Sequence, residues 1–358
     1  VNTLTATVTD EVTTPVTCTT DGEKDYTATV TFNNQTYTDV KTVTVKKTGH
    51  SISGNSCVNC GQPASEGLDM VLISEGEYTV SGIGTCTDTE ILIPTTYNDL
   101  PVVSVEASAF LNNTAITSVV LPDGITSIGE NAFNGCESLT SVTFGKNSQL
   151  SSIRPGAFNY CYSLESITIP ESVTNIGSEA FNYCCGLRSV TFGENSQLTS
   201  IGDGAFNWCE SLESITIPAS VTSIGEWAFV ECYRLVEVWN LSKLNITAGS
   251  EDNGYVGYYA KRVETEPSES YVYTDENGYV IYYDGKVKAL INYTGNETKL
   301  TIPDDITELN CFALSDCYNI TSVTFGENSQ LTSIGDGAFN WCESLESITI
   351  PDSVTSIG

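Results

Sequence analysis

His50, Cys57 and Cys60 have the types and the spacing of a metal site. A Cys-x-x-Cys pair behind a histidine supplies three of the four ligands that tetrahedral zinc takes, and Cys18 is the plausible fourth ligand upstream. A local disulfide and a reduced turn in a linker are the alternatives for the same pair. Zinc at His50, Cys57, Cys60 and Cys18 is therefore a hypothesis, and no other cofactor is suggested.

Catalytic chemistry finds little support elsewhere in the chain. His50 is the only histidine, so the repeats described below contain no Ser-His or Cys-His pair. No Walker-type or Gly-x-Gly-x-x-Gly loop occurs. The acidic turns 251–254 and 275–278 lack the ligand spacing of a dedicated Ca²⁺ loop. A pair of carboxylates for glycoside hydrolysis stays open, because such a pair is defined by its separation in space. We predict a non-enzymatic protein.

The chain that follows these residues is organised by a sequence repeat. An Ala-Phe-x-x-Cys unit recurs at alternating intervals of 25 and 23 residues, and its cysteines are Cys136, Cys161, Cys184, Cys209, Cys232 and Cys342, with Cys317 in the same frame. Self-similarity at such a period is typical of a stacked solenoid. The longer intervals carry Phe-Gly-[Glu/Lys]-Asn-Ser-Gln-Leu, so two extra residues are expected to bulge at one corner of every second turn.

Each repeat contains the pattern of a short strand. Ile167 and Ile169 alternate with Thr168, as a strand with one buried face requires, and Pro170 ends it because proline cannot donate to a ladder. One turn cannot bury its apolar side chains alone, but stacked turns about 4.8 Å apart can. The predicted fold is a β-rich solenoid of short parallel strands and turns of 23 and 25 residues, preceded by a small all-β module.

The repeat resembles a known family. Residues 93–105 (Ile-Pro-Thr-Thr-Tyr-Asn-Asp-Leu-Pro-Val-Val-Ser-Val) precede repeated Ser-Ile-Thr-Ile-Pro-x-Ser-Val-Thr-Ser-Ile-Gly-x-x-Ala-Phe-x-x-Cys units. Together they resemble the BspA-like (Treponema-type) leucine-rich repeat surface protein family over residues 76–240 and 298–358. The chain departs from the general leucine-rich consensus because its cysteine precedes the strand. The resemblance implies a bacterial or protist surface or secreted protein, and several members of the family are adhesins.

Composition limits the partners. The net charge of −31 argues against nucleic acid and anionic membranes, and no apolar run has the length of a membrane helix. Few Lys and Arg, abundant Thr and Ser and a single Met favour an extracellular or cell-surface location. The sequence lacks an initiator Met and a signal peptide and stops at Gly358 inside a repeat, so we expect a fragment.

Five segments follow from these patterns. The N-terminal one is rich in Thr with alternating apolar residues, which favours an antiparallel β module such as the end of an Ig-like domain. A later one is rich in Tyr and contains Asp284-Gly285, a strong hairpin signal. The predicted segments are the β module 1–48, a linker 49–66 with the metal motif, repeats 67–240, a Tyr-rich hairpin insert 241–298, and continued repeats 299–358.

The thirteen cysteines would suggest disulfides in a secreted protein. The repeat cysteines, however, occupy one equivalent position beside Phe and Leu, where a buried free thiol acts as a small apolar residue. We predict free thiols for them, although the spacing of stacked turns also permits bridging. Cys185 is expected to be exposed, and either reactive or a neutral change.

Two surfaces are candidates for binding. An aromatic stripe occupies one repeat position and consists of Tyr160, Tyr183, Trp208 and Trp341; it could stack on sugars, anchor a protein or merely shield a turn edge. The other candidate is the face near the insert, where the rows of Ser and Thr along the strands are broken. Its predicted contact residues are Glu237, Trp239, Tyr255, Tyr258, Tyr259, Tyr279, Tyr282 and Tyr283.

Tyrosine supplies contact area at a low entropic cost, which favours recognition by some of these rings. Packing of the rings between hairpin and solenoid is the alternative. The leading functional hypothesis is an adhesin-like protein that binds a host or neighbouring-cell surface protein. Carbohydrate binding through the stripe and a passive surface stalk are the alternatives.

Overall fold

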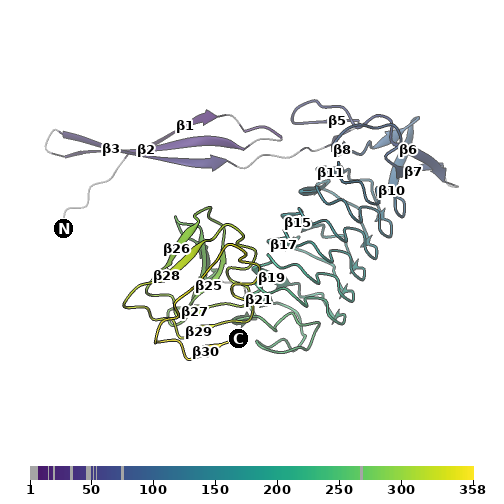
Figure 1. Ribbon diagram of the computed structural model, residues 1–358. Coiled ribbons are helices and arrows are strands. Elements are labelled where there is room, and N and C mark those ends of the chain that lie inside the picture. Colours follow the sequence, from purple (N-terminus) through teal and green to yellow (C-terminus); the bar gives the residue numbers. More distant parts are fainter. Residues whose placement is uncertain are drawn as a thin grey trace.

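The computed structural model describes residues 7–14, 16–18, 21–32, 35–45, 50, 52–53, 55–73, 76–266 and 269–358. The secondary structure of these residues consists of β-strands and turns (Figure 1). In this part of the chain, no helix is long and apolar enough to span a membrane. The prediction of a solenoid preceded by a small all-β module is confirmed.

The N-terminal module is an antiparallel three-stranded sheet. Its strands are β1 (Thr7–Thr14), β2 (Gly22–Phe32) and β3 (Gln35–Val45), in the order β1-β2-β3. In Figure 1 this sheet projects away from the start of the solenoid. A short hairpin of β4 (Ile52–Ser53) and β5 (Ser56–Cys57) follows in the linker.

A first array of stacked turns contains two parallel ladders. The long ladder consists of β8 (Glu90–Leu92), β11 (Ser118–Leu121), β13 (Ser141–Phe144), β15 (Ser166–Ile169), β17 (Ser189–Phe192), β19 (Ser214–Ile217), β21 (Glu237–Asn240) and β22 (Arg262–Glu264). The short ladder consists of β7 (Glu77–Gly82), β10 (Leu100–Val105), β12 (Ser127–Ile128), β14 (Ser152–Ile153), β16 (Asn175–Ile176), β18 (Ser200–Ile201) and β20 (Ser223–Ile224). Strand β6 (Asp69–Ile73) pairs antiparallel with β7, and β9 (Thr96–Tyr97) pairs with β10.

The repeat phenylalanines form the centre of this array. Six buried rings lie in a column, with centroids of neighbouring rings 5.0 to 5.4 Å apart and nearly parallel planes; they are Phe110, Phe133, Phe158, Phe181, Phe206 and Phe229. Backbone bonds hold this spacing: Phe158 N donates to Ala180 O, and Phe181 N donates to Ala205 O, both over 2.8 Å. The Ala-Phe pair therefore packs inside, as the repeat predicts.

The repeat cysteines of the second array, Cys317 and Cys342, are half-buried. The five of the first array are buried thiols that donate to backbone carbonyls. Each sulfur lies 3.1 to 3.3 Å from the carbonyl oxygen of the phenylalanine one turn earlier, for example Cys161 Sγ to Phe133 O and Cys184 Sγ to Phe158 O. Burial raises the pKa of all five thiols, that of Cys136 from 9.0 to about 12. The structure thus holds them as packed thiols and not as disulfides.

This burial predicts a reactivity pattern. At pH 8 the five thiols at Cys136, Cys161, Cys184, Cys209 and Cys232 should resist iodoacetamide in the folded protein and react in urea, because the thiolate is the nucleophile. Since folding raises the pKa of these thiols, their contribution to stability is fully present below pH 9 and is lost as the pH rises through the folded pKa values, which are about 12 in the case of Cys136. Peptide mapping by mass spectrometry measures the labelling, and labelling of these five in the native state would contradict the packing.

The chain forms a second array of stacked turns after the first. Its sheets are separate from the ladders above and consist of β23 (Val272–Thr274), β24 (Tyr279–Tyr283), β25 (Lys288–Tyr293), β27 (Glu308–Leu309), β29 (Ser333–Ile334) and β30 (Ser356–Ile357) on one side, and β26 (Lys299–Ile302) and β28 (Ser322–Phe325) on the other. The segment 241–298 is therefore divided. Its first part completes the first array up to β22, and its second part, the hairpin β24–β25, begins the second.

The two arrays begin in the same way. In the first, the antiparallel hairpin β6–β7 precedes the parallel partner β10; in the second, the hairpin β24–β25 precedes the parallel partner β27. Such a hairpin covers the open edge of a parallel ladder. Asp284 shapes its turn by accepting hydrogen bonds from the backbone N–H groups of Lys286 and Val287, which lower its pKa. The Tyr-rich hairpin is thus an N-terminal cap.

The arrays contact each other near the end of the first, where Figure 1 shows the second array beside β19 and β21. The ring centroids of Tyr233 and Phe312 lie 3.7 Å apart, and Asn310 Nδ2 donates to Tyr233 O over 3.2 Å. Lys261 Nζ also lies 2.6 Å from Glu308 Oε2. The second array therefore packs against the side of the first.

Candidate functional site

The outward face of the long ladder is a surface of hydroxyl groups with different residues at both ends. Register places one row of Ser and one row of Thr on neighbouring strands, and the hydroxyls of Thr168 and Thr191 lie 2.8 Å apart. We call this surface the Ser/Thr window; its residues are Ser141, Thr143, Ser166, Thr168, Ser189, Thr191, Ser214 and Thr216. In the first strand, β8, Glu90 and Leu92 take the places of Ser and Thr, and in β21, the strand before the last, Glu237 and Trp239 do.

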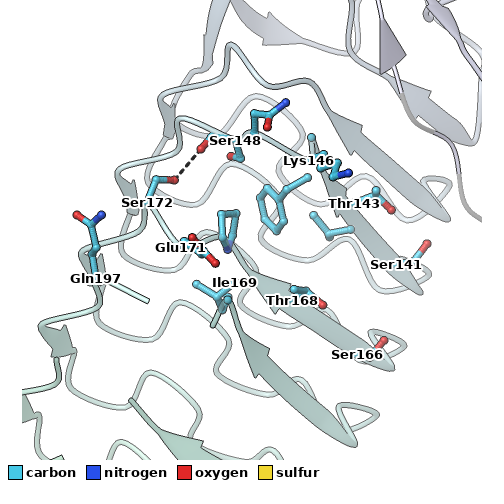
Figure 2. Close-up of a pocket in the computed structure, with 16 residues that line it drawn as sticks. Ser141, Thr143, Lys146, Ser148, Ser166, Thr168, Ile169, Glu171, Ser172 and Gln197 are labelled. Atoms are coloured by element: carbon cyan, nitrogen blue, oxygen red, sulfur yellow. Dashed lines mark hydrogen bonds between the residues drawn. The ribbon is translucent and has the colours of Figure 1, made fainter. Parts of the chain in front are cut away.

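Grooves follow the edge of the Ser/Thr window where the chain leaves the strands. The larger has a volume of about 770 Å³, and Figure 2 shows it between Thr143 and Thr168 on the strands and Ser172 and Gln197 on the outer loop. A second groove of about 650 Å³ repeats the arrangement beside Thr216. Loop residues of the longer and the shorter repeats line the outer side of the larger groove, and Ser172 Oγ joins two of these loops by donating to the carbonyl oxygen of Ser148 over 2.9 Å.

The aromatic stripe lies at the opposite corner, where the chain approaches the strands. The rings of Tyr160, Tyr183 and Trp208 are stacked, with centroids 4.9 and 5.3 Å apart. Tyr160 is exposed, and the other two rings are half-buried. Trp341, at the equivalent position of the second array, is 60% exposed and lies outside this stack. The structure therefore brings together three of the four stripe residues.

The stripe positions have an unusual backbone. Tyr160, Tyr183 and Trp208 have φ values of 58°, 56° and 58°, in the left-handed region, and Gly135 occupies the same position one turn earlier at 73°. A non-glycine residue there costs about 1–2 kcal/mol. Glu231, Asp316 and Trp341 have the same left-handed conformation at the equivalent position, so it belongs to the repeat and not to the ring stack, and glycine would adopt it without strain.

The stripe continues into the junction of the two arrays. Trp208 meets Tyr233 edge-on at 6.4 Å, and Tyr233 meets Tyr259 at 5.4 Å. Tyr259 in turn contacts Tyr258, and Tyr258 contacts Tyr255. We call this series of contacting rings the aromatic path; it consists of Tyr160, Tyr183, Trp208, Tyr233, Tyr259, Tyr258 and Tyr255. Tyr233 is buried, because the second array covers its ring with Phe312.

Three of the predicted contact residues are buried and cannot meet a partner at this surface. Glu237 is 0% exposed, because Ser270 Oγ and the backbone N–H of Tyr271 donate to its carboxylate over 2.5 and 2.8 Å. Tyr279 lies in the core of the second array, and Tyr282 packs against Val236. The prediction that Glu237, Tyr279 and Tyr282 contact a partner is therefore wrong, because each of them packs within the protein.

The other predicted residues stay accessible to different degrees. Tyr258 and Tyr283 are exposed, whereas Trp239, Tyr255 and Tyr259 are half-buried. Cys185 is half-buried, and burial together with the Glu210 carboxylate raises its pKa to about 12, so the expectation of an exposed, reactive thiol is wrong.

Carboxylates surround the aromatic path. Burial raises the pKa of Glu210, and the nearby Asp316 carboxylate raises it further. Glu231 accepts a hydrogen bond from the Tyr233 hydroxyl, and burial raises its pKa. Burial and the neighbouring Tyr160 ring raise the pKa of Tyr183. The path thus combines apolar ring faces with negative charge.

A Cys/His cluster lies at the opposite end of the first array. The ligand atoms of Cys18, His50, Cys57 and Cys60 all lie within 4.8 Å of one another, and they are the only such group of potential metal ligands found among the described residues. Cys18 Sγ and Cys57 Sγ are 3.9 Å apart, and Cys60 Sγ is 3.4 Å from His50 Nδ1. The structure therefore brings together all four residues of the zinc hypothesis.

One family model matches the repeats of both arrays. A model of the BspA type leucine rich repeat region matches six copies over residues 103–246 and 288–358, more than half of the chain. A leucine-rich repeat protein of Treponema pallidum has 26% identity and a TM-score of 0.46, over 57% of this chain and 98% of its own.

Two further crystal structures are similar. A leucine-rich cell surface protein of Faecalibacterium prausnitzii has 24% identity and a TM-score of 0.38, over 82% of this chain and 83% of its own. The pneumococcal vaccine antigen PcpA has 22% identity and a TM-score of 0.39, over 81% of this chain and 70% of its own. No curated protein matches the chain.

Proposed function

Because the chain belongs to the BspA-type leucine-rich repeat family, we propose that it is a non-enzymatic, adhesin-like protein that binds a partner protein outside the cell. The observation that carries this proposal is the aromatic path. Tyr233 is buried and only links the series, whereas the exposed and half-buried rings on either side of it give contact area at a low entropic cost, and such residues dominate the binding energy of protein interfaces.

The charge around the path favours a basic partner. The chain has 45 Asp and Glu against 14 Lys and Arg, and Glu210 and Glu231 lie beside the rings. A partner with Lys and Arg on its surface would be steered toward this face, and this attraction weakens as salt is added. We therefore expect binding that is anchored by the rings and is stronger at low ionic strength.

Carbohydrate binding is the second candidate, because stacked rings also fit the apolar faces of sugars. The exposed Tyr160 ring and the adjacent Tyr162 would be its platform. The passive stalk, which would bind nothing through these surfaces, remains the third. The three candidates predict different results on the same variants.

Trp208→Gly is expected to lower affinity for the protein partner about 30-fold, the effect of losing one anchor of about 2 kcal/mol. Glycine keeps the backbone, since Gly135 has the same left-handed conformation in an earlier turn. The measurement is surface plasmon resonance against immobilised extracellular-matrix proteins at two salt concentrations, with a glycan array in parallel.

Trp341→Gly is the matched control. Residues 189–225 and 322–358 are identical except at Ala219 and Asp352, but Trp341 lies outside the ring stack. The Trp341→Gly variant should therefore change the affinity for the partner less than twofold. If Trp208→Gly and Trp341→Gly lowered affinity equally, this would contradict binding through the aromatic path. Glycan binding that depends on Trp208 would favour the carbohydrate candidate, and the absence of any binding would favour the stalk.

A further inference from the structure

We propose that Cys18, His50, Cys57 and Cys60 bind one zinc ion, and that this ion fixes the N-terminal segments to the first turns of the solenoid. The four residues come from three places in the chain: Cys18 from the connection between β1 and β2, His50 from two positions before β4, and Cys57 and Cys60 from the end of β5 and the turn that follows it. Nothing in the binding function proposed above requires this site.

The distances fit tetrahedral coordination. Ligands at the usual zinc–sulfur length of about 2.3 Å are about 3.8 Å apart in a tetrahedron, and a sulfur and a histidine nitrogen are about 3.6 Å apart. The sulfurs of Cys18 and Cys57 are 3.9 Å apart, and Cys60 Sγ lies 3.4 Å from His50 Nδ1. Three thiolates and one imidazole are also a common donor set for structural zinc, whereas Ca²⁺ and Mg²⁺ take oxygen ligands.

The local backbone forms the turn that such a site needs. Gly61 N donates to Cys57 O over 2.8 Å, and Cys57 N donates to Gln62 O over 2.7 Å. Gly61 has a φ of 76°, which glycine adopts without strain, so the chain reverses directly after Cys60. This tight turn places the sulfurs of Cys57 and Cys60 on the same side.

The far nitrogen of His50 faces the Glu90 carboxylate but forms no hydrogen bond with it. His50 is 6% exposed, its Nδ1 faces Cys60, and its Nε2 lies 3.4 Å from Glu90 Oε2. Histidines that bind zinc usually donate their other N–H to a carboxylate, which fixes the ring and strengthens its basicity. Glu90 belongs to β8, so the solenoid itself would supply this supporting carboxylate.

Neither packing nor a disulfide explains the whole group. Cys18 and Cys57 do pack on Leu92 and Val120 of the long ladder, and a disulfide could join those two sulfurs. Such a bond would leave no reason for a buried histidine and a third sulfur to converge there. A metal accounts for all four donor atoms and for Glu90.

The proposed ion would explain how the segments that carry Cys18 and Cys57 cover the first strands of the long ladder. Leu92 and Val120 stand where Thr stands in later turns, and they are buried beneath the cluster. Ser65 forms two hydrogen bonds with the backbone of Leu92. Leu92 N donates to Ser65 Oγ over 3.0 Å, and Ser65 N donates to Leu92 O over 2.8 Å. The ion would join these contacts to the strand module through Cys18.

The test uses the full chain, purified with reductant, stripped by a chelator and titrated with zinc chloride alone. We expect one tightly bound zinc per chain by atomic emission. The tetrahedral spectrum of cobalt(II) should appear on substitution, and trypsin should cut residues 1–66 more slowly when zinc is present. Cys57→Ser should abolish binding, while Cys185→Ser, which removes a thiol outside the cluster, should leave it unchanged.

A second variant keeps the test decisive if Cys57→Ser misfolds. Glu90→Gln preserves all four ligands and should lower zinc affinity about 10–100-fold, the usual effect of losing a carboxylate behind a zinc histidine. Glu130→Gln, an exposed carboxylate elsewhere, should have no effect. Less than stoichiometric zinc in the reduced protein, iron in its place, or a Cys18–Cys57 disulfide in protein purified without reductant would overturn the proposal.

Discussion

Replacing Phe206 by alanine is expected to lower the free energy of unfolding by about 3–5 kcal/mol, the usual cost of removing a buried phenylalanine. Phe206 is fully buried, and its ring lies 5.2 Å from the rings of both Phe181 and Phe229. The neighbouring turns cannot close the cavity, because the backbone bond from Phe206 N to Ala228 O fixes their spacing. Urea unfolding followed by circular dichroism measures the change.

Phe339→Ala is the matched control for this experiment. It lies in the near-identical copy of the same repeat, but it is half-buried and the preceding turn carries Leu314 instead of a phenylalanine. We expect it to cost less than half as much. Because each turn of a solenoid contacts only its neighbours, native-state hydrogen exchange should place the Phe206→Ala effect in the adjacent turns. Equal costs for the two variants would show that the stack of rings contributes nothing beyond the local sequence.

The repeat pattern predicts the fold well because every copy repeats the same local solution. Ile167, Phe181 and Cys184 lie where the spacing places them, since their neighbours are equivalent residues one turn away. The bulge in the longer repeats was likewise predictable from its two extra residues. It was not predictable that loop residues of the longer and the shorter repeats line a groove, because a groove depends on how adjacent loops lie in space.

Prediction was poorer where segments far apart in sequence meet. Glu237 interrupts a row of Ser, and this interruption marked it correctly as special, but its burial depends on Ser270 and Tyr271, which lie much later in the chain. Tyr279 looked like a recognition residue because the insert is rich in tyrosine. Its place in a cap becomes clear only when β24 and β25 are seen to open a new ladder.

The candidate metal site also combines residues that a local sequence pattern predicts with one residue that it does not. His50, Cys57 and Cys60 carry a local signature, and Cys18 could be chosen because few other cysteines lie upstream of the repeats. Glu90 had no such signal, since a single glutamate at the start of a strand is common. A comparison of β8 with β21 reveals it: Glu90 and Glu237 both replace Ser, and both contact a segment that covers the ladder.

Replacing Arg262 by methionine is expected to lower the free energy of unfolding by about 3–5 kcal/mol, because it leaves the buried Glu237 carboxylate without its cation. The side chain of Glu237 is 1% exposed and that of Arg262 is 11% exposed, and Arg262 Nη1 lies 3.4 Å from Glu237 Oε1. The guanidinium also stacks on the Tyr271 ring at 4.1 Å and donates to the backbone carbonyl of Glu269 over 3.1 Å. One side chain therefore links the last turn of the first array to the segment that leads into the second.

The double variant Glu237→Gln/Arg262→Met separates the lost charge pair from lost packing. A neutral amide still accepts from Ser270 and Tyr271 and requires no cation, so the double variant should be more stable than Arg262→Met alone. Arg188→Met removes an exposed guanidinium and should change stability by less than about 0.5 kcal/mol. Urea unfolding, with proteolysis of residues 241–298 as a local probe, measures all three variants. If the double variant were less stable than Arg262→Met, packing of the Arg262 side chain and not the buried charge would hold the insert on the ladder.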